Sequence, residues 1–198
     1  MLHVALIVVD VQNDFCPGGS LAVPSGDKVI APLNKMIAFA KKKGWLVIAS
    51  RCWHPETTNH FKKDGGIWPV HCVQGSHGAE FHPKLRVKDD ATIVSKGTKP
   101  REEGYSAFDG FVENDGCPLR PFLRNRGIDT IYIGGLATDY CVKATALGGV
   151  QNFFETIVIV DACRAVNLKD GDDTRAFAEM REKSVSLLNI AEVLARNA

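Results

Sequence analysis

Hydrophobic and polar positions along the chain alternate between strand-like and helix-like patterns. Residues 4–10 form an almost continuous β-branched run, which is typical of a parallel strand buried on both faces. Residues 27–43 repeat apolar positions at helical spacing and end in lysines before Gly44, as expected of a helix. The same patterns predict strands at 45–51, 91–96, 130–134, 156–161 and 185–188, and helices at 118–126, 140–153, 172–183 and the C-terminus.

This alternation predicts an α/β fold of three layers, α/β/α, with a mostly parallel six-stranded sheet. The 198 residues suffice for one domain with a sizeable core, and they contain no internal repeat or linker. Residues 1–198 are therefore expected to form a single domain. A long insert at about 52–90 is rich in His, Pro and Gly and lacks periodicity, and loops of that length are usually functional.

Charge and apolar content exclude several classes of partner. The 24 basic and 23 acidic residues are spread along the chain, so neither nucleic acid nor a membrane surface is an expected partner. The apolar runs are shorter than the roughly 20 residues that cross a bilayer, and the N-terminus lacks the basic start of a signal peptide. Six irregularly spaced cysteines without a C-x-x-C motif argue against a disulfide framework and favour a reducing cytoplasm.

Three reactive side chains fall at the carboxyl ends of predicted strands, where open α/β sheets bind their ligands. Asp10 ends the first strand, Lys96 ends the third, and Cys141 opens the helix after the fourth. A thiol at a helix N-terminus ionises more easily than a free one. With a cation and a carboxylate nearby, it has what thiol-based acyl transfer needs. The alternative is structural: Asp10 forms a turn, Lys96 is solvated and Cys141 packs against the sheet.

A second group of candidate residues lies in the insert. Cys52 and His54 are two positions apart, His60 follows, and His71 and Cys72 come later. Imidazole nitrogens combined with a thiolate or carboxylate form zinc and iron sites. The alternative is that these residues are ordinary surface and core positions of a loop.

Five motifs occur in order along the chain: Asp10-Val-Gln-Asn-Asp-Phe, Arg51-x-Trp-His54-Pro, Trp68-Pro-Val-His71-Cys, Lys96-Gly and Gly135-Leu-Ala-Thr-Asp-Tyr-Cys141. In this the chain resembles the nicotinamidases, a branch of the isochorismatase-like cysteine hydrolases. The resemblance covers nearly the whole sequence. It implies an isochorismatase-like fold and an amidohydrolase that converts nicotinamide to nicotinate and ammonia, which would serve NAD salvage.

The resemblance also implies roles for individual residues. Asp10, Lys96 and Cys141 would form the catalytic triad. The backbone N–H groups of Ala137 and Cys141 would form the oxyanion hole, next to a cis peptide bond between Leu136 and Ala137. The flat apolar side chains expected around the substrate ring are Phe15, Trp68 and Tyr105.

The metal site implied by the resemblance falls on Cys52, His54 and His71, with His60 close by as a further candidate. The family has an aspartate at position 52, so this chain departs from the pattern there. Because a thiolate is a softer ligand than a carboxylate, zinc is the expected divalent ion, with iron and manganese as alternatives. If Cys52 does not ligate, the metal site is expected to be weak or absent.

Other functions stay open from the sequence. One is another amide or ureido hydrolase of the same superfamily, with the same triad and a different pocket. The other is a non-enzymatic metal- or ligand-binding α/β module in which Cys141 is structural. The expected partner is a small molecule, nicotinamide or a close aromatic amide, and a homo-oligomer is left open.

Overall fold

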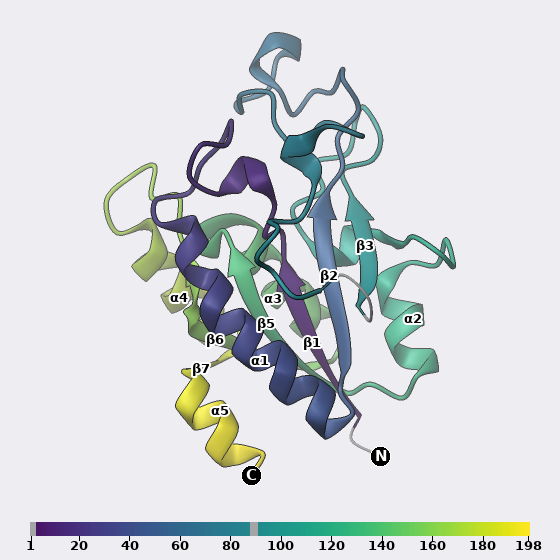
Figure 1. Cartoon of the computed structure of the whole chain (residues 1–198), viewed down its shortest axis with the longest axis vertical. Helices are drawn as coiled ribbons and strands as arrows, with labels where there is room; N and C mark the ends of the chain where they lie inside the picture. Colours follow the sequence, from purple (N-terminus) through teal and green to yellow (C-terminus); the bar gives the residue numbers. More distant parts are fainter. Residues whose placement is uncertain (1–2, 88–90) are drawn as a thin grey trace.

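The computed structural model describes residues 3–87 and 91–198, which form a seven-stranded sheet with helices on both faces (Figure 1). The strand order is β4-β3-β2-β1-β5-β6-β7, and every neighbouring pair is parallel except β3 and β4. The predicted three-layer α/β fold is confirmed. The strands are β1 (Val4–Val9), β2 (Leu46–Cys52), β3 (Thr92–Lys96), β4 (Phe111–Val112), β5 (Thr130–Leu136), β6 (Glu155–Arg164) and β7 (Ser186–Leu188).

The prediction of six strands was wrong by one, because β4 was missed. This strand has only two residues and pairs antiparallel with the edge of β3, Val94 opposite Val112. Two residues are too few to show the alternation by which a strand is recognised in a sequence. The mainly parallel character of the sheet is unaffected.

Five α-helices cover the sheet: α1 (Ile30–Lys43), α2 (Leu119–Asn125), α3 (Lys143–Gln151), α4 (Asp172–Glu182) and α5 (Ile190–Arg196). In Figure 1, α1 crosses in front of the sheet and α3 lies behind it. The apolar positions of α1, among them Leu33 and Met36, are buried, and Gly44 ends this helix in a left-handed conformation. None of the helices in the described residues is long and apolar enough to cross a bilayer.

Two predicted helices begin differently in the structure. The segment predicted as helix from residue 27 starts with a 3-10 turn (Gly26–Val29), and α1 follows it. The segment predicted as helix from residue 140 starts with a π-helical turn (Thr138–Val142), and α3 follows that turn. Single-turn π segments often occur at functional sites, and this one contains Cys141.

The sheet places the candidate residues at one edge. All six residues of β1 are buried because helices cover both faces of the strand. Since β1, β2, β3 and β5 are parallel, their carboxyl ends meet, and the blue segment that follows β2 in Figure 1 lies beyond those ends. This segment is the predicted insert, whose last residues, 88–90, lie outside the described part of the chain.

Candidate active site

The ends of three strands bring Asp10, Lys96 and Cys141 together. Asp10 Oδ2 lies 2.8 Å from Lys96 Nζ, and that ammonium donates to Cys141 Sγ at 3.4 Å. Asp10 leaves β1 with a φ of +50°, a left-handed conformation that aspartate tolerates better than most residues. Ser50 donates a hydrogen bond to Asp10 Oδ1 at 2.7 Å. Lys96 and Cys141 follow Asp10 by 86 and 131 positions in the sequence, yet the three residues share one buried cluster.

The ammonium of Lys96 is the centre of this cluster and is fully buried. It also donates to the Gly104 carbonyl at 2.7 Å and to Cys52 Sγ at 3.1 Å. Burial favours the neutral amine, but the attraction of Asp10 and the two thiols outweighs it and holds the pKa of Lys96 well above its ordinary value. Lys96 therefore stays charged at neutral pH.

Asp10 is also fully buried, and its environment suits proton transfer. Burial, followed by the nearby Cys52, raises the pKa of this carboxyl to about 6, although Lys96 and Ser50 act in the opposite direction. A group with a pKa near the working pH is the most effective general base and acid.

Cys141 lies in the π-helical turn that follows β5. The peptide bond between Leu136 and Ala137, directly before this turn, is cis, as the resemblance implied. Gly135 allows β5 to lie against β1 here, because a Cβ at this position would be 2.1 Å from the Val9 carbonyl oxygen. Ala137 and Cys141 both line the same pocket.

A second thiol, that of Cys52, belongs to the same cluster. One ligand atom from each of Asp10, Cys52 and Cys141 lies within 4.8 Å of the others, and the Cys52 thiol is 3.6 Å from Asp10 Oδ2. A hydrogen bond from Cys141, together with the charge of Lys96, holds the pKa of Cys52 well below its ordinary value against the effect of burial. The same hydrogen bond and burial hold the pKa of Cys141 well above its usual value, contrary to the ready ionisation expected from the sequence, so Cys141 needs a base to remove its proton.

The backbone at position 52 is held by Gln12, whose side chain is fully buried. Gln12 Oε1 accepts from Cys52 N–H at 2.8 Å, and Gln12 Nε2 donates to the Cys52 carbonyl at 2.8 Å. The same amide nitrogen donates to the Ala79 carbonyl at 2.8 Å. The carboxamide thus makes the two backbone hydrogen bonds that a neighbouring strand would make, at a point beyond the end of β1. Its hydrogen bond to Ala79 connects the insert to the sheet.

Three buried histidines form a separate group beside this cluster. One ring nitrogen from each of His54, His60 and His71 lies within 4.8 Å of the others. His54 Nδ1 is 3.1 Å from the Gly97 carbonyl and His71 Nδ1 is 2.8 Å from the Pro69 carbonyl, so each of these nitrogens carries the proton and donates. The Nε2 atoms of His54 and His71 are then left with free lone pairs.

This histidine group fits a divalent metal ion. His54 Nε2 is buried and has no hydrogen-bond partner among the described residues, which is costly unless another group satisfies it. Burial, followed by the neighbouring imidazoles, lowers the pKa of His60 to about 3, and burial also lowers the pKa of His71. Neutral imidazoles with converging lone pairs are zinc ligands.

The structure divides the predicted ligands between two groups. His54 and His71 lie together, and His60, named as a further candidate, joins them. Cys52 is grouped with Asp10 and Cys141, although His54 lies near enough to the Cys52 thiol to contribute to its lowered pKa. A role of Cys52 as a metal ligand therefore stays a prediction, and the histidines make up a candidate site without it.

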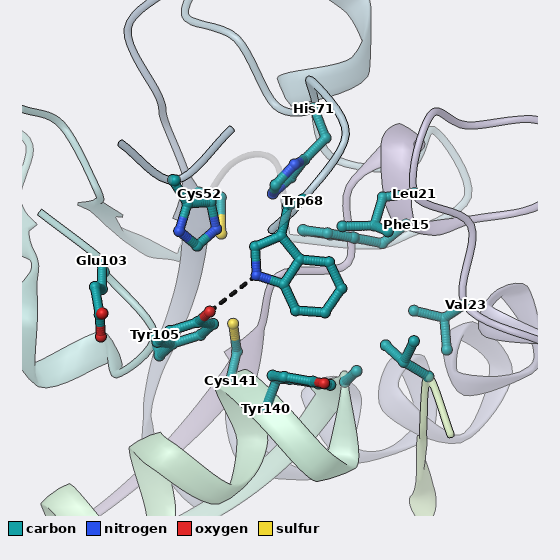
Figure 2. A pocket seen from close by; sticks show the side chains of 14 residues that line it. Phe15, Leu21, Val23, Cys52, Trp68, His71, Glu103, Tyr105, Tyr140 and Cys141 are labelled. Carbon is teal, nitrogen blue, oxygen red and sulfur yellow. Dashed lines mark hydrogen bonds between the residues drawn. The ribbon is translucent and has the colours of Figure 1, made fainter. Parts of the chain in front are cut away.

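The predicted ring-binding residues line a pocket of about 410 Å³ above the sulfur of Cys141. Phe15, Trp68 and Tyr105 all contribute, and Trp68 Nε1 donates to Tyr105 Oη at 2.9 Å (Figure 2). Tyr140 adds an aromatic wall, with its ring centroid 4.8 Å from that of Trp68. The pocket is small and largely apolar, as sites for aromatic small molecules are.

Several pocket residues could not be found from the sequence. Leu21, Val23 and Val166 belong to segments without a reactive side chain, and only the folded chain brings them to the pocket. Tyr140 could have been named as a pocket residue only from its position directly before Cys141. Asp139, by accepting from the backbone N–H groups of Val166 and Asn167 at 3.0 and 2.8 Å, holds one of these walls in place.

Comparison with known proteins agrees with this geometry. An isochorismatase domain matches residues 4–192. The chain belongs to the isochorismatase family. This isochorismatase-family chain is 40% identical to the nicotinamidase of Escherichia coli (strain K12) over 203 residues, covering 95% of each protein.

Two solved structures share the fold of this family member. One is the pyrazinamidase of Pyrococcus horikoshii in complex with zinc, with a TM-score of 0.87, 44% identity and coverage of 95% of this chain and 99% of that one. The other is PnC1 from L. infantum in complex with nicotinate, with a TM-score of 0.83, 33% identity and coverage of 95% and 93%. The first of these relatives holds the metal that the three histidines fit.

Proposed function

We propose that this chain hydrolyses nicotinamide to nicotinate and ammonia through a thioester on Cys141. The observation that carries the proposal is the cluster of Asp10, Lys96 and Cys141 beneath an aromatic pocket. Its support from the comparisons is the identity of 40% with a nicotinamidase over nearly the full length of both chains. One structural relative was solved in complex with nicotinate, which agrees with an aromatic small molecule as the ligand of this pocket.

In the first half of the reaction, Asp10 removes the thiol proton of Cys141 and becomes neutral, while Lys96 stabilises the resulting thiolate. The sulfur attacks the carboxamide carbon and forms a tetrahedral oxyanion. The backbone N–H groups of Ala137 and Cys141 stabilise this oxyanion, and removing one such donor typically costs about 3–4 kcal/mol of barrier. Asp10 then gives its proton to the nitrogen as the C–N bond breaks, which releases ammonia.

In the second half, Asp10 removes a proton from water, and the hydroxide attacks the thioester carbon. The C–S bond breaks, nicotinate leaves, and the proton returns to Cys141. The raised pKa of Asp10, about 6, suits a group that must accept and release a proton twice in each cycle.

The aromatic pocket orients the substrate ring. Phe15, Trp68 and Tyr105 offer flat surfaces on which a pyridine ring packs, and the Trp68–Tyr105 hydrogen bond fixes two of them relative to each other. Correct placement of the carboxamide above Cys141 supplies a large part of the rate enhancement in reactions of this kind.

His54, His60 and His71 are proposed to hold a divalent metal, zinc in the first instance. When bound, this ion supplies a Lewis acid for a ring nitrogen of the substrate and so contributes to orientation. A ligand role for Cys52 is testable with Cys52→Asp, which restores the residue type of the family. Metal content and apparent substrate affinity should change more than the fold, and unchanged values would remove Cys52 from the ligand set.

The wider assignments are proposals as well. Residues 1–198 form one domain, supported by the family match over 4–192. A small-molecule substrate without nucleic-acid or membrane partners is supported by the balanced charge of the chain. A cytoplasmic location is supported by the six free cysteines, all of them within the described residues. A homo-oligomer is left to measurement.

The proposal is tested by measuring ammonia release from nicotinamide with and without a chelator, alongside elemental analysis. The wild type is expected to turn over nicotinamide, and Cys141→Ala is expected to lose this activity. A panel of other amides and ureido compounds decides the substrate class, and a strong preference for a non-aromatic amide would refute nicotinamide as the substrate. No turnover of any amide, with slow alkylation of Cys141, would favour a binding module.

A further inference from the structure

Two cysteines face the same pocket in this chain. Cys52 and Cys141 both line it, and Figure 2 draws both sulfur atoms among its side chains. Their sulfurs contact one ammonium, Lys96 Nζ, at 3.1 and 3.4 Å and lie within 4.8 Å of each other.

We propose that Cys52 and Cys141 form a dithiol site that reacts with hydrogen peroxide to give a reversible disulfide. This inference goes beyond the proposed hydrolysis, because it needs only that the two sulfurs are accessible from the pocket and close to each other. Disulfides in a reducing compartment are usually catalytic or redox-sensing, and a pair at a reactive centre belongs to that class.

The surroundings favour this pair over other reactions of the same thiols. Gln12 holds the backbone of Cys52 through both its N–H and its carbonyl, and the Cys52 sulfur contacts the same Lys96 ammonium as the Cys141 sulfur. The two sulfurs lie within 4.8 Å of each other, and they must approach to the roughly 2.05 Å of a disulfide. The pocket above Cys141 admits a molecule the size of hydrogen peroxide.

The chemistry takes two balanced steps. Cys141 sulfur attacks one oxygen of hydrogen peroxide, the O–O bond breaks, and Cys141 becomes a sulfenic acid as one water leaves. Cys52 sulfur then attacks the Cys141 sulfur, the S–O bond breaks, and a second water leaves with the Cys52 proton. The two thiols lose two electrons and two protons in total, and peroxide is reduced to two waters. A dithiol reductant reverses the change by thiol–disulfide exchange.

The disulfide would stop hydrolysis and also protect the nucleophile. A sulfenic acid without a thiol beside it goes on to sulfinic and sulfonic acids, which dithiothreitol does not reduce. Cys52 captures the sulfenic acid before that happens. A side chain without a thiol at position 52 has no such reaction, so this chain should recover from peroxide where a Cys52 variant does not.

Peptide mapping of the whole protein tests the pairing without using activity. Trypsin cleaves after Arg51 and Lys62 and after Arg126 and Lys143, which places Cys52 in peptide 52–62 and Cys141 in peptide 127–143, each with one cysteine. After treatment with peroxide and alkylation of free thiols, peptide 52–62 should be found joined to peptide 127–143 and released by dithiothreitol. Two alkylated peptides without a cross-link, or Cys141 joined to another cysteine, would overturn the proposal.

Variants then test the consequence. Peroxide-treated wild-type protein should regain its ammonia release with dithiothreitol, whereas Cys52→Ser should lose any activity it has irreversibly and carry sulfinic acid on peptide 127–143. Cys117→Ser is the matched control, because Cys117 lies before α2 and outside the pocket, and it should recover as the wild type does. Equal recovery in Cys52→Ser would refute the protective role. If this variant does not fold, the peptide map of the wild type still decides the pairing, and it does so even if nicotinamide is not the substrate.

Discussion

Replacing Lys96 with methionine removes the charge at the centre of the site while keeping the length of the side chain. The ammonium contacts Asp10 at 2.8 Å, the Gly104 carbonyl at 2.7 Å and two thiols, and it is fully buried. Its removal leaves Asp10 as a buried carboxylate without a cation. Breaking a buried ion pair in this way typically costs about 3–5 kcal/mol of unfolding free energy.

The cost should depend on pH, because Asp10 can escape by binding a proton. Its folded pKa, about 6 in the wild type, exceeds the value of about 3.9 in an unfolded chain. Stability from this group is therefore fully present below the unfolded pKa and is lost as pH rises through the folded one. Lys96 lowers the pKa of Asp10 in the folded wild type, so this pKa should rise further in Lys96→Met. The variant should therefore continue to lose unfolding free energy at pH values where the wild type no longer does. The cost should be about 3–5 kcal/mol near pH 8 and about 1 kcal/mol or less near pH 5.

Urea unfolding followed by tryptophan fluorescence at these two pH values measures the difference. Lys143→Met is the matched control, since its ion pair with Glu179 at 2.9 Å is partly exposed and pairs of that kind are worth about 1 kcal/mol or less at either pH. An equal cost for Lys96→Met at both pH values would refute the account of the Asp10–Lys96 pair. A cost no larger than that of the control near pH 8 would do the same.

Four further outcomes are expected. Cys141→Ala should reduce ammonia release by at least roughly 10⁴-fold while circular dichroism is unchanged, and substantial residual turnover would remove Cys141 as the nucleophile. In the wild type kcat/KM should fall on the acid side as Asp10 is protonated, with an apparent pKa near the value of about 6; a flat profile down to about pH 4 would contradict a base role for Asp10. Tyr105→Phe removes the hydrogen bond to Trp68 and should raise KM by several-fold, about 1 kcal/mol, with little change in kcat; a change in kcat alone would argue against ring placement. Gly97→Ala places a Cβ 2.5 Å from His54 Cε1 and should therefore lower the zinc content found by elemental analysis. The control Gly75→Ala has a similar φ of +74° and nothing within 4 Å, so its zinc content should be unchanged. Equal zinc content in both variants would show that His54 is not a ligand.

The fold and much of the site could be predicted from the sequence for identifiable physical reasons. Parallel strands deliver whatever follows them to one edge of the sheet, so Asp10, Lys96 and Cys141 could be grouped although 131 positions separate the first from the last. The strand β1 was clear because a strand buried on both faces is apolar throughout. The cis peptide bond and the roles of single residues came from the resemblance and not from periodicity.

What could not be predicted depends on contacts between distant segments. The strand ends place Cys52 at the same edge of the sheet, but its contact with the ammonium that Cys141 also contacts depends on side-chain directions, which leave no pattern in the sequence. The apolar pocket walls come from loops without periodicity. His60 was named only as a further candidate because its distance from His54 follows from the irregular path of the insert.

The most direct test of the proposed function is to stop the reaction with nicotinamide in acid and map the protein by mass spectrometry. A nicotinoyl group is expected on peptide 127–143, removed by hydroxylamine as a thioester is, together with an ammonia burst. Turnover of nicotinamide with no adduct on that peptide, and with ammonia release retained when Cys141 is replaced by alanine, would contradict it.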